Sequence, residues 1–136
     1  MTSYLRVNLS GTLPAGQFAV IAAPEVTLPA ETLRFAFPLP QDKIQNGAPD
    51  GIALIDTVTG TVLDALSYEG SIAAAMSPGI SGTVNLVEGT APAATLADSS
   101  TEAGAPVRHH NGSDTNDAAT DWAYATLPTL GTANIP

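Results

Sequence analysis

The chain has 136 residues, of which 44% are hydrophobic and 12% charged, and 13 acidic residues against 4 basic ones give a formal charge of −9. This composition excludes a disordered polyelectrolyte, and a surface of that sign disfavours direct nucleic-acid binding because it repels phosphate backbones. The absence of cysteine excludes a disulfide framework and a thiolate metal site. We expect one domain, residues 1–136, which is either complete or a fragment of a larger domain or protein.

The composition also bears on location. Lys43 is the only lysine, whereas Thr, Ser, Ala and Gly are abundant, as is typical of secreted bacterial domains. No apolar run approaches the ~20 residues that a membrane span needs. We therefore expect an extracellular or cell-surface protein without a membrane span, whose signal peptide was removed or lies upstream.

Strand patterns of period two dominate the first part of the chain. Apolar and polar residues alternate over 5–9, which predicts a half-buried strand. A nearly continuous apolar run over 17–23 predicts a central strand with both faces covered. The alternation returns over 33–37, where Pro38 and Pro40 end the strand or confine it to a sheet edge.

A β-hairpin follows. Turn signals at 46–47 and 49–51 precede two mostly apolar runs, 52–56 and 61–68. The loop between them, 57–60, has four residues and ends on a glycine, where a left-handed residue is favoured. These features predict an antiparallel pair of strands.

The rest of the chain carries weaker signals. Asp64 breaks the alternation of the second hairpin strand and predicts a β-bulge or a satisfied side-chain hydrogen bond. Small residues over 69–81 indicate a loop, 84–86 fits a short strand, and 89–106 lacks clear periodicity. Only 118–124 fits a helical turn. Many short strands separated by turns predict an all-β, immunoglobulin-like β-sandwich with short antiparallel strands and long loops.

Five stretches, in order, resemble bacterial lamin-tail domains. They are NLSGTLPAGQFAVI (8–21), QNGAPDGIALID (45–56), VLDALSYEG (62–70), RHHNGSDTNDAATDW (108–122) and PTLGTAN (128–134). The resemblance implies an immunoglobulin-like sandwich used for binding and scaffolding, without catalytic residues. In bacteria such domains are found in secreted and surface proteins, sometimes beside extracellular nuclease or phosphatase domains.

The chain departs from the family pattern at both ends. Trp122 stands where the family has phenylalanine, and Leu130 interrupts the closing threonine-proline-glycine pattern. Met1 precedes what corresponds to about the fourth strand of the family, so the opening strands are missing from this sequence. A sandwich without those strands has an open sheet edge, which invites strand addition by another chain.

The most chemical-looking segment is the Asp- and Asn-rich stretch after His110. Oxygen ligands at Asp114, Asn116, Asp117 and Asp121 have a spacing that can wrap a hard cation such as calcium, although the stretch does not match an EF-hand loop. The alternative interpretation, which we favour, is turn chemistry in which these side chains bond to the local backbone and Asp117 or Thr120 caps a short helical turn.

No Gly-x-Ser-x-Gly elbow accompanies the serine and histidine residues, so the sequence does not indicate an enzyme. The first hypothesis is a non-catalytic binding, adhesion or scaffolding module of a secreted or surface bacterial protein. The alternatives are a structural subunit completed by a strand from a neighbouring chain, in a fibre or oligomer, and an accessory domain of an extracellular nuclease. The expected partner is a protein, which includes a second copy bound through the open edge. Apart from calcium, no cofactor is expected.

Overall fold

The computed structural model describes residues 1–37, 44, 47–109 and 111–134. Within these residues the fold is all-β, as predicted: it contains three small two-stranded sheets, none of them closed, and one helix of four residues. The elements in chain order are β1 (Ala19–Ala22), β2 (Leu33–Ala36), β3 (Asp50–Asp56), β4 (Thr61–Tyr68), β5 (Ala105–Arg108), α1 (Ala118–Asp121) and β6 (Trp122–Ala125). Asn46, Pro38 and Pro40, which carried a predicted turn and strand end, lie outside the described residues.

The predicted hairpin is confirmed as the antiparallel pair β3–β4, in which Ile52 lies opposite Leu66. Gly60 ends the connecting loop with a φ of +73°, a left-handed conformation that glycine adopts without strain. The register shifts next to Leu54, so Leu63 has no partner in β3 and forms the predicted bulge. The predicted turn at 49–51 is wrong beyond Pro49, because residues 50 and 51 pair with β4 and begin β3.

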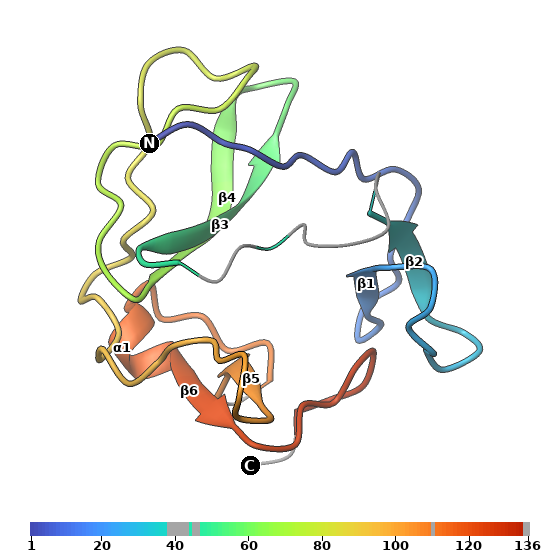
Figure 1. The fold of residues 1–136 in the computed structure, drawn as a ribbon. Coiled ribbons are helices and arrows are strands. Elements are labelled where there is room, and N and C mark those ends of the chain that lie inside the picture. Colours follow the sequence, from blue (N-terminus) through green and yellow to red (C-terminus); the bar gives the residue numbers. More distant parts are fainter. Residues whose placement is uncertain (38–43, 45–46, 110, 135–136) are drawn as a thin grey trace.

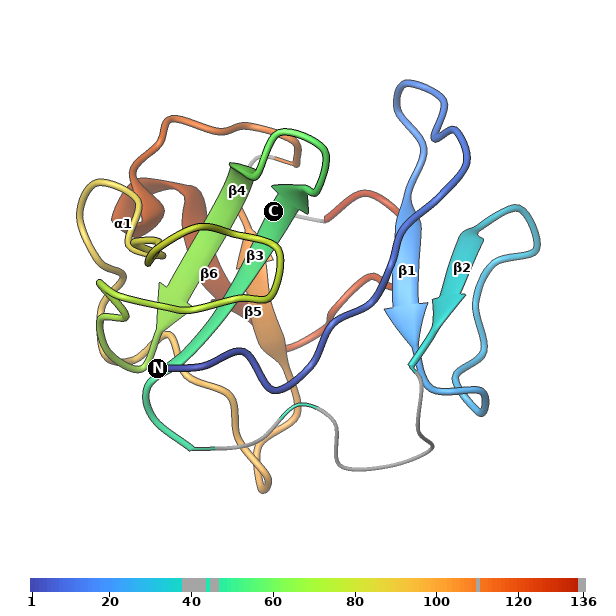
Figure 2. The same ribbon diagram turned by 90° about the horizontal axis from the view of Figure 1, so that it is seen from above.

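The core lies on both faces of this hairpin. On one face, apolar residues of β4 pack against the segment that contains α1 and β6, and Figure 2 shows β3–β4 lying over β5–β6. This cluster consists of Leu66, Tyr68, Leu96 and Ala118, with Trp122 packed against it. On the other face, Ala65 packs with Ile72 and Leu86. Gly51 lies so close to this second cluster that a Cβ atom there would be 2.8 Å from Leu86 Cδ1.

The pair β1–β2 is parallel, with Ala19 opposite Leu33, and it stands to one side of the other two sheets in both views (Figures 1 and 2). Arg34 stabilises the connection between its strands, because its guanidinium donates hydrogen bonds to the carbonyls of Val26 and Ala23. The prediction of a covered central strand over 17–23 is wrong. Among the described residues β1 has a single partner strand, and the Ile21 side chain is exposed.

The predicted strand over 5–9 is also wrong, because its alternating pattern finds no strand to pair with in the described part of the chain. Among the described residues, the single β-bridge of the N-terminal segment is at Thr2, which pairs parallel with Met76. The predicted helical turn over 118–124 is confirmed only as far as Asp121, because residues 122–125 pair antiparallel with β5.

The short strand expected over 84–86 is reduced to single contacts. Val84 bridges Ala75, and Leu86 donates a backbone hydrogen bond to Ile72. Across the residues that the structure describes, no helix has the length and apolar character that crossing a membrane requires.

We predict that Leu66→Ala lowers the free energy of unfolding by about 2–4 kcal/mol, because Leu66 is 4% exposed and its truncation leaves a cavity in the core. Leu63→Ala is the matched control from the same strand. Its side chain is 58% exposed, so the loss there should stay below about 1 kcal/mol. Urea unfolding followed by Trp122 fluorescence measures both variants, and equal losses would contradict the assignment of the core.

Candidate functional site

The four residues predicted to bind calcium hold short-range contacts with the polypeptide. Asp114 Oδ1 accepts a hydrogen bond of 2.9 Å from the backbone N–H of Asn116. Asp121 accepts two bonds of 2.8 Å from Thr115, one from the backbone N–H and one from the hydroxyl. These are the bonds of a tight polar turn, the interpretation that the sequence favoured.

The sequence predicted a cap at Asp117 or Thr120, and the structure shows Asp117 as the N-cap of α1. Its Oδ1 accepts from the N–H of Thr120 at 3.1 Å, and its Oδ2 accepts from the N–H of Thr90 at 3.2 Å. The hydrogen bonds from Thr90, followed by those from Thr120, hold the pKa of Asp117 below its usual range. The carboxylate therefore joins the loop before residue 90 to the start of the helix.

Asp121 is buried at the end of α1. Burial is the largest single effect and opposes ionisation, but the hydrogen bonds from Thr115, with that from the backbone of Asp117 and the charge of Arg108, together hold the pKa of Asp121 below its usual range. Within the described residues, no group of three or more His, Cys, Asp or Glu side chains has an arrangement that would hold a metal ion. Calcium binding stays a prediction, and the geometry assigns these carboxylates to the turn and the cap.

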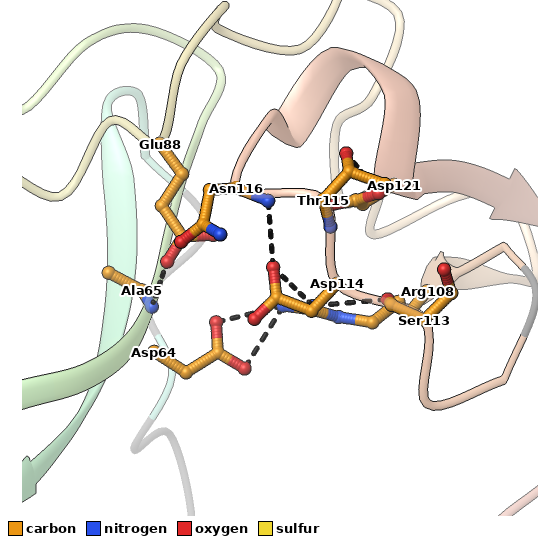
Figure 3. Close-up of polar contacts among 9 residues, drawn as sticks. All are labelled: Asp64, Ala65, Glu88, Arg108, Ser113, Asp114, Thr115, Asn116 and Asp121. Carbon is orange, nitrogen blue, oxygen red and sulfur yellow. Dashed lines mark hydrogen bonds and ion pairs between the residues drawn. The ribbon is translucent and has the colours of Figure 1, made fainter.

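An arginine connects this turn to the hairpin (Figure 3). Arg108 ends β5, and its Nη2 donates to both carboxylate oxygens of Asp64 in β4, at 2.8 and 3.0 Å. Its Nη1 contacts Asp114 Oδ1 at 3.3 Å and the carbonyl of Ser113 at 3.2 Å. The guanidinium lies 5.1 Å from the centre of the Trp122 ring. One partly buried cation thus links β4, β5, β6 and the polar turn, and we call this group the Arg108 clamp.

The sequence predicted the role of Asp64 in the clamp but not that of Arg108. The broken alternation at Asp64 predicted a satisfied side-chain hydrogen bond, and that prediction is confirmed by the bidentate bond to Arg108. The only sequence signal for Arg108 was a single arginine next to an acidic stretch in a chain with few cations. Such a signal names no partner 44 residues away.

Glu88 covers the outer edge of β4. Its Oε1 accepts a hydrogen bond of 3.1 Å from the N–H of Ala65, so this N–H points away from β3. Glu88 Oε2 is buried without a hydrogen-bond partner, and burial raises the pKa of this carboxyl group. A side chain therefore occupies the place where another strand would bond to β4.

The outer edge of β3 is open. Antiparallel pairs alternate between those that exchange backbone hydrogen bonds and those that do not. Because the N–H of Ala65 bonds to Glu88, the opposing residue Ala53 belongs to a pair that does not exchange them. The N–H and C=O of Ala53, and by the same alternation those of Gly51, point to the side of β3 away from β4. Among the described residues no strand lies there.

Two large apolar side chains lie along this edge without cover. Ile52 is 58% exposed and Leu54 is 45% exposed. Ile52 lies opposite the buried Leu66, so the same face of the hairpin is covered over β4 and uncovered over β3. Unpaired backbone groups beside exposed apolar side chains are the features that let an extended segment add to a sheet.

Comparison of the chain with protein-family models, with curated proteins and with solved structures returned no match.

We predict that Arg108→Met lowers the free energy of unfolding by about 2–3 kcal/mol, because it leaves Asp64 and Asp114 facing each other without the shared cation. Arg6→Met is the control, since Arg6 is exposed and bonds one carbonyl, and its effect should stay within about 0.5 kcal/mol. In a double-mutant cycle, Asp64→Asn should add little to Arg108→Met. Full additivity in urea unfolding would show that the two side chains do not act together.

The stability of the protein should depend on pH through Glu88. Its pKa is raised in the folded state above the ordinary value of 4.5, so the folded state binds more protons than the unfolded chain as the pH falls toward that value. The contribution of Glu88 to stability is therefore lost as the pH rises through the folded-state pKa. We expect the stability of the unmodified protein, relative to Glu88→Gln, to increase as the pH is lowered from 7 to about 5. A difference that does not change with pH in parallel urea titrations would contradict this.

Proposed function

We propose that the protein is a non-catalytic binding or scaffolding module that takes up an extended segment of another protein along the open edge of β3. The single observation that carries this proposal is the contrast between the two edges of the hairpin. The edge of β4 is occupied by the Glu88 side chain, whereas the edge of β3, beside exposed Ile52 and Leu54, has no partner strand among the described residues.

Strand addition uses both features of this edge. The main-chain groups of Gly51 and Ala53 supply hydrogen bonds whatever the partner sequence, and the side chains at alternate positions supply selectivity. An incoming strand that bonds to these groups forms non-hydrogen-bonded pairs at Ile52 and Leu54. Side chains lie closer together in such pairs, so apolar residues of the partner would cover both.

We further propose that the module is a lamin-tail-like, immunoglobulin-like sandwich of an extracellular or surface protein. The support is an antiparallel hairpin packed through a shared core on a second antiparallel pair, together with the sequence patterns described above. The alternative of a structural subunit, in which the added strand belongs to a neighbouring copy, uses the same edge. The alternative of a nuclease accessory domain rests on the resemblance alone.

The open edge can be tested by amide hydrogen exchange in the isolated protein. The N–H groups of Gly51 and Ala53 should exchange much faster than those of Ile52 and Leu54, which bond to β4. Addition of a pool of extended, β-forming heptapeptides should slow the exchange at Gly51 and Ala53.

Leu54→Lys should abolish that protection, because a charged side chain on an edge strand opposes strand addition. Val58→Lys is the matched control, since Val58 is 94% exposed at the tip of the hairpin and should leave the protection unchanged. Protection of both amides before any peptide is added would refute the proposal, as would exchange that no peptide slows.

A further inference from the structure

We infer that the segment received by β3 comes from a different chain and is basic at both ends and apolar between them. This inference rests on the proposed function and adds the chemistry of the partner. It follows from the order of side chains along β3, from the carboxylates at the two ends of that strand, and from the result of pairing β3 with a second copy of itself.

Along one face of β3 the side chains are, in order, acidic, apolar, apolar and acidic. Side chains of a strand alternate between its faces, so Asp50, Ile52, Leu54 and Asp56 lie on the same face. The bulge is in β4 and does not disturb this order. Asp50 and Asp56 are about 20 Å apart along an extended strand, which matches a partner of seven residues.

At one end of β3, the local hydrogen bonds of the hairpin loop favour the ionised form of the Asp56 carboxylate. Asp56 Oδ1 accepts hydrogen bonds from the backbone N–H groups of Val58, at 2.8 Å, and Thr59, at 3.4 Å. The bond from Val58, followed by those from Thr59, holds the pKa of Asp56 below its usual range. The turn therefore holds an ionised carboxylate in a fixed position at the end of the open edge. Among the described residues, Asp56 forms no ion pair.

The Asp50 end carries more than one acidic group. Asp50 is buried where β3 begins, opposite Tyr68, and Glu69 follows directly in the chain. Burial, followed by the charges of Asp98 and Asp50, raises the pKa of Glu69 above its ordinary value. The structure thus places two acidic residues, Asp50 and Glu69, at this end of the hairpin.

Within the described residues, neither Asp50 nor Asp56 forms an ion pair. Arg108 is engaged with Asp64 and Asp114, and Arg34 bonds to carbonyls near β1. The edge therefore combines an apolar centre with an aspartate at each end, in a protein whose formal charge is −9. A partner with Lys or Arg opposite Asp50 and Asp56 is complementary to it.

A second copy fits this edge poorly. An antiparallel twofold pairing of β3 that places Ile52 opposite Leu54 of the other copy also places Asp50 opposite Asp56. Like charges directly opposite each other destabilise a strand pair. A shift of the register by two residues in either direction places an aspartate opposite an apolar side chain. Self-association is thus opposed by the same residues that favour a basic partner.

The test measures the binding of three peptides to the isolated protein, by calorimetry and by amide exchange at Gly51 and Ala53. They are Ac-Lys-Thr-Val-Thr-Val-Thr-Lys-NH2 and the same sequence with glutamate or with serine at both ends. We expect the lysine peptide to bind at least about tenfold more tightly than the glutamate peptide, and to lose most of this advantage at about 0.5 M salt. Asp56→Asn, which keeps the acceptor for the turn, should reduce the preference. Glu25→Gln, an exposed control near β1, should leave it unchanged.

The possible failures are distinguishable. Equal binding of all three peptides at Gly51 and Ala53 would overturn the inference and leave strand addition intact. Binding of none would overturn both. A concentration-dependent dimer in analytical ultracentrifugation that Leu54→Lys dissociates and Val58→Lys does not would show that the partner is a second copy, and would overturn the basic-partner inference alone.

Discussion

The architecture depends on the bidentate bond between Arg108 and Asp64. The two side chains come from β5 and β4, strands of different sheets, and the bond joins these sheets at the border of their shared core. The same guanidinium lies over Trp122 and reaches the turn at Asp114, so one cation orients β6 and the acidic turn as well. Because small two-stranded sheets are marginal on their own, a link of this kind decides whether they pack as one body. The carboxylates of the turn therefore bond to Arg108 and to the local backbone.

The clamp and Glu88 together leave the hairpin asymmetric. Both act on β4, since Arg108 bonds Asp64 and Glu88 accepts from the N–H of Ala65. No equivalent side chain covers β3 in the part of the chain that the structure describes. Natural sheets generally protect their edges, so an unprotected edge with exposed apolar side chains indicates a binding site for another strand. The acidic ends of β3 then restrict what can use it, because they repel a second copy and attract basic segments.

The acidic stretch shows how a cluster in sequence can separate in function. Asp114, Asp117 and Asp121 lie within eight residues, and their spacing suits a hard cation. In the structure each carboxylate bonds a different group: Arg108, the start of α1, and Thr115. An N-cap here was predictable because it depends only on residues 117–120. The candidate binding edge was not, because its openness depends on Glu88 and on which strands fail to pair.

The sequence by itself determined the all-β class, the β3–β4 hairpin with its glycine-ended loop, the irregularity at Asp64 and a helix cap at Asp117 or Thr120. Each of these follows from alternation, turn chemistry or capping, which act over a few neighbouring residues. Only the tertiary structure decided that residues 5–9 stay unpaired, that β1 lies parallel to β2, and that Arg108 reaches Asp64. These outcomes depend on contacts between residues far apart in the chain, which no local pattern records. The same holds for the edge of β3: its residues were predicted as a strand, and its exposure came from the arrangement of everything around it.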